Sequence, residues 1–318
     1  MSPETPQIEP KGLRQAMRGI RLLKRRRHAP HRRRRRVPPL SVMPTLFTLG
    51  NLVAGFAAIH YASKPLTFNG PWGWSSLTLA GVLVFLGMFL DSVDGSVARL
   101  VRSTSGLGAQ LDSLADMVTF GVAPAYMMLQ LVSHYVGPES TATIIGPEAD
   151  KPFAKILWGV AAVYVCCTAL RLARFNVETP SARVEDHLVF RGLPSPGAAG
   201  TVASLIIMHQ HWLAATDATY SDMSQNFARL VAFGIPLVTL LCAVSMVSSI
   251  PYTHMTNRYV RGGRSFKYVA RIVILLAIAV WWPQVSLAAI FTLYAVSGPI
   301  RMFVHWLRTR HALPTQAT

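Results

Sequence analysis

The chain has 318 residues, of which 51% are hydrophobic and only 14% are charged. A typical soluble domain carries about 25% charged residues, so the composition argues against a soluble globular protein. The apolar residues fall in blocks of roughly 17–25, the length that crosses a bilayer as a helix. The sequence therefore predicts an all-α integral membrane protein.

The chain begins with a strongly basic segment, and the formal net charge of the whole sequence is +17. Residues 11–36 hold thirteen Lys and Arg, and from Leu13 to Leu23 apolar residues recur at helical spacing. This pattern predicts an interfacial helix that binds an anionic membrane surface. A basic run can also indicate nucleic-acid binding, but the rest of the chain offers no nucleic-acid module, so we expect no such partner.

Eight apolar segments follow this basic arm, and we expect each to span the membrane as one helix of a single bundle. The predicted spans are residues 42–62, 75–98, 111–134, 153–174, 196–213, 228–249, 267–282 and 285–306. The expected organisation is an arm over residues 1–40, a core over residues 41–250, and a C-terminal transmembrane hairpin with a basic tail over residues 251–318.

The charges of the predicted loops alternate from one span to the next. Arginines lie in loops 99–110, 175–195 and 250–266 and in the C-terminal tail, whereas loops 135–152 and 214–227 are richer in acidic residues. Positive charge accumulates on the cytoplasmic side of membrane proteins. We therefore expect both termini and the three arginine-bearing loops to face the cytoplasm.

Four of only fourteen acidic residues lie near the ends of two neighbouring spans. Asp91 and Asp94 are three residues apart on the second span, so they share one helix face. Asp112 and Asp116 are four apart on the third span and also share a face. Carboxylates at membrane depth are costly unless they are paired or bound to a cation. Helix capping or an arginine partner would explain a single Asp, but four acids in register favour bound Mg²⁺ or Mn²⁺.

Small and basic residues surround these acids. Gly95 and Gly108 lack side chains, so a ligand can approach the backbone closely, and Ala98 is also small. Arg99 offers a planar fork that suits phosphate oxygens. A cation channel or transporter is the alternative for intramembrane carboxylates, but an ion path has no need of an arginine beside its acids. The pattern therefore favours a diphosphate-binding site.

The same residues carry a family resemblance. The stretch Asp91-x2-Asp94-Gly95-x2-Ala98-Arg99-x8-Gly108-x3-Asp112-x3-Asp116 resembles the signature of the CDP-alcohol phosphatidyltransferases at every fixed position. The resemblance implies an enzyme with a six-helix core, here followed by two further helices. It implies cleavage of the diphosphate of CDP-diacylglycerol, transfer of the phosphatidyl group to an alcohol, and release of CMP. It also implies a homodimer.

The resemblance also assigns expected roles to particular residues. It implies that the four matching Asp residues hold two Mg²⁺ or Mn²⁺ ions and that Asp116 is also the catalytic base. The positions that it implies for the nucleotide site are Gly95, Ala98, Arg99 and Gly108, with Ser105 as a weaker candidate. Pro44, Thr48, Asn51 and Gly55 resemble the first helix of the family without an assigned role, and Thr45 stands where members commonly have Asn.

A second region bears on the acceptor alcohol. Residues 170–176 and 190–196 resemble membrane-integral bacterial phosphatidylserine synthases, which implies serine as acceptor and a bacterial inner membrane. Arg171 and Arg174 would hold an acidic acceptor or a lipid phosphate, and Asn176 would bind the amine of serine. Topological anchoring is the alternative for either arginine. Glycerol 3-phosphate, inositol phosphate and choline stay open as other acceptors.

Overall fold

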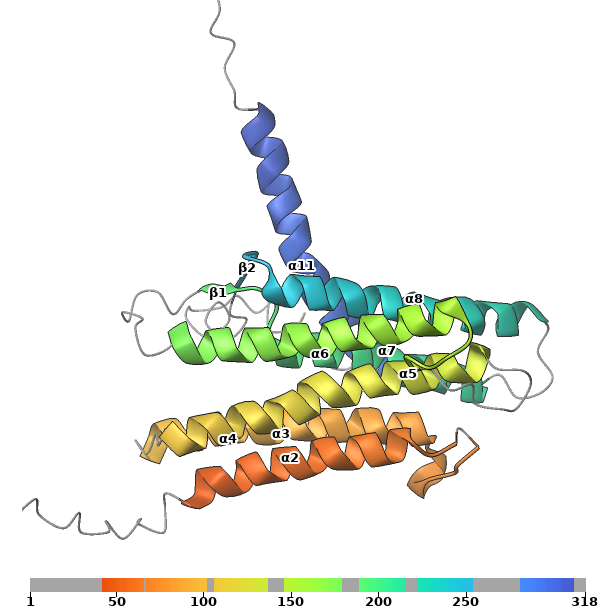
Figure 1. Ribbon diagram of the computed structural model, residues 1–318, viewed down its shortest axis with the longest axis horizontal. Helices are drawn as coiled ribbons and strands as arrows, with labels where there is room; N and C mark the ends of the chain where they lie inside the picture. Colours follow the sequence, from red (N-terminus) through yellow and green to blue (C-terminus); the bar gives the residue numbers. More distant parts are fainter. Residues whose placement is uncertain are drawn as a thin grey trace, which may run out of the picture. The chain divides into compact units, whose positions relative to one another are not determined.

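The computed structural model describes residues 42–65, 67–101, 106–136, 146–178, 189–215, 222–253 and 281–311. Most of them are helical (Figure 1). The helices are α2 (Val42–Ala62), α3 (Ser76–Val101), α4 (Gly106–Asp116), α5 (Ala123–Val136), α6 (Pro152–Glu178), α7 (Ser195–Ala215), α8 (Asp222–Val247) and α11 (Pro283–His311). The expected interfacial helix within residues 11–36 and nearly all of predicted span 267–282 lie outside the described residues.

Six helical segments of the described part are long and apolar enough to cross a membrane, which indicates a multi-pass membrane protein. They are Thr45–Ala62, Ser76–Val97, Leu107–His134, Pro152–Val177, Ala228–Val247 and Pro283–Val304. Each of the six overlaps one of the spans predicted from the sequence.

Helix α7, predicted as the span over residues 196–213, is not one of the six. It has 21 residues, but its interior includes the polar residues Thr201, Ser204, His209 and Gln210, all of them buried. These side chains are satisfied inside the bundle: the Thr201 hydroxyl donates to the Gly197 carbonyl at 2.8 Å, and a His209 ring nitrogen lies 3.0 Å from the Ala228 carbonyl. Helix α7 packs on α3, α8 and α11, so protein surrounds most of its polar surface.

The predicted third span is longer than expected and is not one regular helix. Helix α4 begins at Gly106, and a π-helical stretch, η3 (Met117–Val122), joins it directly to α5. The wider turn leaves backbone groups without regular helical partners, and the Phe120 carbonyl accepts a hydrogen bond from the Tyr164 hydroxyl of α6 at 3.1 Å. Single π-turns inside helices are rare and are frequent at functional sites. This one starts immediately after Asp116.

Glycines allow α2, α3 and η3 to approach one another closely. A side chain at Gly55 of α2 would collide with Thr119 of η3. A side chain at Gly87 of α3 would collide with Thr119 and would lie 2.7 Å from Oδ1 of Asn51. Small residues at such contacts are typical of helix packing in membranes. As a result, α2 lies against both α3 and α4 (Figure 1).

The fold is all-α as expected, with one short antiparallel ribbon in addition. Strand β1 (Val189–Arg191) pairs with β2 (Pro251–Thr253), with Phe190 opposite Tyr252. Strands of three residues are too short to show an alternating pattern in the sequence. The ribbon connects the start of α7 with the chain that follows α8.

Gly192 closes this connection. Its φ of +85° is a left-handed conformation that favours glycine. Its N–H donates to the Ile250 carbonyl at 2.8 Å, and the N–H of Leu193 donates to the Ser245 carbonyl at 2.9 Å. A side chain at Gly192 would collide with the Met246 carbonyl at the end of α8. Both the conformation and the close approach therefore require glycine.

Gly192→Ala should destabilise the protein by about 1–3 kcal/mol, because alanine is strained in this conformation. The measurement is the thermal midpoint in detergent, followed by tryptophan fluorescence. Gly234→Ala is the matched control, since Gly234 lies within α8 and open space surrounds the position of its missing side chain. Alanine is a better helix former than glycine by roughly 0.5–1 kcal/mol, so the control should not lower the midpoint. Equal midpoints for wild type and Gly192→Ala would contradict the strain argument.

Candidate functional site

Three carboxylates meet where the C-terminal half of α3 faces α4. One oxygen each of Asp91, Asp112 and Asp116 lies within 4.8 Å of the others. Asp116 is 9% exposed, and the other two are half-buried. In the described part of the chain no Lys or Arg forms an ion pair with any of the three. Three like charges so close together need a cation, and an all-oxygen set of ligands fits Mg²⁺ or Mn²⁺.

The fourth predicted metal ligand, Asp94, lies beside this cluster and not within it. It is buried, and one of its oxygens accepts a hydrogen bond from the Thr48 hydroxyl of α2. It is near enough to interact electrostatically with each of the three clustered carboxylates. The structure thus brings together three of the four predicted ligands and ties the fourth to α2.

Asn51 of α2 supports Asp116 in the same way. Its Nδ2 donates to Oδ1 of Asp116 at 3.0 Å, and its backbone carbonyl accepts from the Thr119 hydroxyl at 2.9 Å. Asn51 is fully buried, and its Oδ1 has no hydrogen-bond partner within the described residues. Burying an amide oxygen without a hydrogen-bond partner destabilises the protein. A donor group of a ligand, or a cation, that binds to this oxygen would therefore be stabilised.

Thr48 and Asn51 are therefore part of the candidate site, although their types and spacing alone do not assign them a role. Their signal in the sequence is two polar residues three apart, hence on one face, in a mostly apolar span. That signal does not reveal which residues they face. Only the packing of α2 on α3 and α4 places them against Asp94 and Asp116.

The predicted nucleotide-binding positions are described only in part. Within the described part of the chain, no atom outside the local backbone of α3 lies within 4 Å of the place where a side chain would start at Gly95, so this side of α3 leaves room for a ligand. Gly108 is half-buried, as the third residue of α4. The side chains of Ala98 and Arg99 and the whole of Ser105 lie outside the described residues, so their roles stay predictions.

Of the three predicted acceptor-binding residues at the C-terminal end of α6, Asn176 and Arg171 have different neighbours, and Arg174 is near enough to Arg171 to interact with it electrostatically. Asn176 reaches α4, where its Nδ2 donates to Oγ of Ser113 at 2.8 Å, one residue from Asp112. Arg171 is half-buried and interacts electrostatically with Tyr294 of α11. Arg174 is also half-buried. The structure thus brings Asn176 to the helix that carries the acids, and Arg171 toward α11.

Comparison with known proteins agrees with this site. Residues 41–309 match the family model of the CDP-alcohol phosphatidyltransferases. The chain is 31% identical over 265 residues to CDP-diacylglycerol–serine O-phosphatidyltransferase of Helicobacter pylori. The aligned residues cover 83% of this chain and 92% of the relative. It is 33% identical over 159 residues to the Bacillus subtilis protein of the same name, and this match covers 50% of this chain and 72% of the relative.

An archaeal protein is also similar. Archaetidylserine synthase of Methanothermobacter thermautotrophicus is 30% identical over 220 residues, which cover 69% of this chain and 72% of the relative. The family match extends over the acid cluster, its α2 support and α11. The chain belongs to the CDP-alcohol phosphatidyltransferase family.

Proposed function

We propose that the protein transfers the phosphatidyl group of CDP-diacylglycerol to L-serine and releases CMP, as a step of phospholipid biosynthesis. The cluster of Asp91, Asp112 and Asp116 carries the proposal, because it places three carboxylates within 4.8 Å of one another in an apolar helix bundle. Serine as the acceptor is supported by the names of the Helicobacter and Bacillus relatives.

The acids are the proposed ligands of two Mg²⁺ or Mn²⁺ ions, with Asp94 as the fourth ligand residue. Such ions, when bound, offset negative charge on the reacting phosphates. The chain's own contribution is to hold the carboxylates in place. Thr48 holds one oxygen of Asp94, and Asn51 holds Oδ1 of Asp116. Both bonds come from α2, so α2 orients acids on two other helices.

Asp116 is the proposed base. The serine hydroxyl is a weak nucleophile at neutral pH, and a positioned base accelerates such a step by about 10²–10⁴-fold. The serine oxygen forms a bond to the β-phosphorus, the bond from that phosphorus to the bridging oxygen breaks, and CMP departs. The hydroxyl proton passes to Asp116, whose Oδ1 is held by Asn51 and whose Oδ2 is the proposed proton acceptor.

Direct attack by serine is the proposed route, without a covalent phosphatidyl-enzyme. Two hydroxyls near the acids are already engaged in hydrogen bonds. Ser113 donates to the Ala109 carbonyl and accepts from Asn176, and Thr48 donates to Asp94. A serine or threonine nucleophile needs a base to activate it. Among the contacts of the described residues, the Ser113 hydroxyl donates to a backbone carbonyl, and the Thr48 hydroxyl donates to Asp94, which is a proposed metal ligand.

The remaining predicted residues complete the proposed substrate sites. Open space beside Gly95 supports a place for the CDP group on that side of α3. Ala98, Arg99, Ser105 and Gly108 are proposed to line the same site. Asn176, bonded to Ser113 next to the acids, is proposed to lie on the acceptor side. Arg171 and Arg174 are proposed to bind the carboxylate of serine or a lipid phosphate.

Metal dependence can be tested independently of the reaction. A ligand at 100 times its dissociation constant stabilises a folded protein by about 2.7 kcal/mol, so Mn²⁺ should raise the thermal midpoint of EDTA-treated protein. Asp112→Asn should remove most of this increase and also raise the midpoint of metal-free protein, because it relieves repulsion between carboxylates. Asp150→Asn, at an exposed loop residue, should behave as wild type. An unchanged Mn²⁺ effect in Asp112→Asn would exclude the cluster as the metal site.

The acceptor is identified by a panel of alcohols. Purified protein with CDP-diacylglycerol and Mn²⁺ is given serine, glycerol 3-phosphate, inositol, inositol phosphate or choline, and CMP release is measured. Serine should give the fastest release, and Asp116→Asn should slow it by about 10²–10⁴-fold with Mn²⁺ saturating. Faster release with another alcohol would replace serine. Wild-type turnover by Asp116→Asn would show that Asp116 is not the base. Rapid exchange of labelled CMP into the lipid without serine would refute direct attack.

The orientation of the bundle is also a proposal, with both termini and the acid cluster on the cytoplasmic side. In a variant without the three native cysteines, Ser103→Cys in loop 99–110 should react with a membrane-impermeant maleimide only after the cells are permeabilised. Glu148→Cys, at an exposed residue of loop 135–152, is the matched control and should react in intact cells. The reverse pattern would invert the proposed topology.

A further inference from the structure

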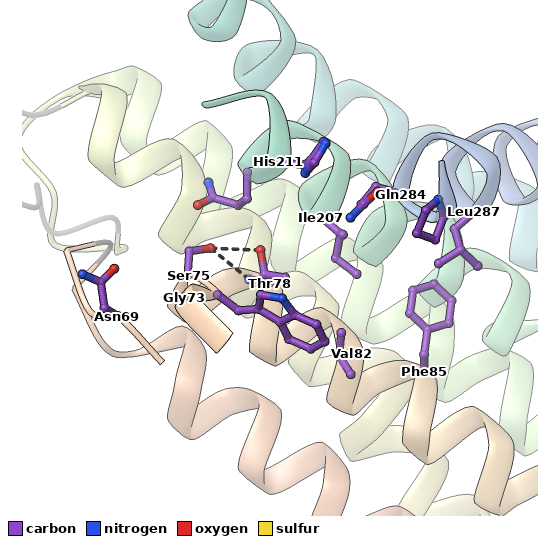
Figure 2. A pocket seen from close by; sticks show the side chains of 13 residues that line it. Asn69, Gly73, Ser75, Thr78, Val82, Phe85, Ile207, His211, Gln284 and Leu287 are labelled. Atoms are coloured by element: carbon purple, nitrogen blue, oxygen red, sulfur yellow. Dashed lines mark hydrogen bonds between the residues drawn. The ribbon is translucent and has the colours of Figure 1, made fainter. Parts of the chain in front are cut away.

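A cavity of about 670 Å³ lies between α3, α7 and α11 (Figure 2). Its volume falls in the usual range of ligand pockets, roughly 300–1,000 Å³. On α3 the lining residue nearest to the acids is Phe85, which precedes Asp91 by six residues. At 1.5 Å per residue the two are ~9 Å apart along the helix. None of the four acids lines the cavity, so the cavity is separate from the acid cluster.

The polarity of the α3 wall changes with depth. Ser75 and Thr78 line the cavity at the start of the helix, and their hydroxyls lie 3.0 Å apart. Val82 and Phe85 line it one and two turns further along. Figure 2 shows the same separation, with Asn69, Ser75 and Thr78 toward one end of the cavity and Phe85 toward the other.

The other two walls follow the same order. On α7, Ile207 lies nearer the middle of the helix than His211. On α11, Gln284 lies in the first turn and Leu287 one turn further in. All three helices therefore present polar groups at the end of the bundle and apolar groups toward its middle. This arrangement matches an amphiphile with a polar end and a hydrocarbon chain.

An aromatic pair closes the inner end of the cavity. Phe85 packs against Phe291 of α11, with ring centroids 5.4 Å apart. Gly200 of α7 admits Phe291, because any side chain there would collide with that ring. From Ser75 to Phe85 the helix rises ~15 Å, so the cavity has room for part of an acyl chain.

Tryptophans mark the polar end as the level of the membrane–water interface. Trp72 and Trp74 lie in the connection before α3, with ring centroids 5.3 Å apart, and Trp72 is 83% exposed. Trp212 near the end of α7 and Trp281 and Trp282 before α11 are exposed as well. Tryptophan is enriched at membrane interfaces. The apolar part of the cavity therefore lies at the depth of the lipid chains.

We propose that this cavity binds a glycerophospholipid of the bilayer, with one acyl chain between α3 and α11. The side chains at the polar end supply amide, hydroxyl and imidazole groups that can donate to the ester carbonyls of a glycerolipid. No Asp, Glu, Lys or Arg is among the described residues that line the cavity. The charged headgroup of the lipid extends beyond it, and the site does not suit the diphosphate of CDP-diacylglycerol.

Filling the cavity tests the proposal. Leu287→Trp and Val82→Trp occupy its apolar part. Leu293→Trp on α11 and Leu86→Trp on α3 are matched controls at exposed residues that do not line it. Protein is washed in detergent, and the retained phospholipid is counted by native mass spectrometry and mapped with a photoreactive acyl chain. Gel filtration and the thermal midpoint identify variants that fail to fold.

Wild type, both controls and Asp112→Asn should each retain one phospholipid per chain. The two cavity-filling variants should retain roughly tenfold less, equivalent to about 1.4 kcal/mol. Because no described residue that lines the polar end of the cavity is an Asp, Glu, Lys or Arg, phosphatidylcholine and phosphatidylglycerol should be retained about equally. Equal retention by folded filling variants and controls would show only annular lipid and overturn the proposal. Loss of the lipid in Asp112→Asn, or a strong preference for anionic lipid, would also overturn it. None of these outcomes depends on serine being the acceptor.

Discussion

The site depends on holding like charges close together in an apolar bundle. Asp91, Asp112 and Asp116 approach within 4.8 Å, and Asp94 adds a fourth negative charge nearby. Carboxylates would separate in water, so the protein has to impose this geometry through packing. Two hydrogen bonds from α2, from Thr48 and from Asn51, act directly on the acids. Helix α2 is thus the support of the site, although none of the clustered acids lies on it.

The close packing of α2 explains several features that are otherwise unrelated. Gly55 and Gly87 admit Thr119, and the Thr119 hydroxyl bonds the carbonyl of Asn51. The π-helical stretch begins at the residue after Asp116, where the helix changes from carrying acids to packing as core. A larger residue at Gly55 would push α2 away from η3, and one at Gly87 would push α3 away from both. The π-helical stretch and the two glycines therefore both help to place Asn51 against Asp116.

The second region of resemblance combines architecture with chemistry. Gly192 and Leu193 bind the end of α8 through backbone hydrogen bonds, and the Tyr252 hydroxyl of β2 donates to the Ala295 carbonyl of α11 at 3.0 Å. These contacts tie α7, α8 and α11 together near Tyr294, which interacts with Arg171. Asn176, by contrast, faces the acid-bearing helix. One part of this second region therefore holds the helices together, and another part lies on α6 against the helix that carries Asp112 and Asp116.

The sequence by itself determined the membrane class, six of the eight predicted spans and the four acids, because apolar length and helical spacing are local properties. It also showed polar residues at positions 48 and 51. Tertiary structure decided the rest. It separated Asp94 from the three clustered acids, gave Thr48 and Asn51 their partners, buried the polar side chains in the interior of α7, and formed the cavity from α3, α7 and α11. Spacing along one helix specifies a face, but the residue that meets this face comes from a distant segment, and only packing brings the two together.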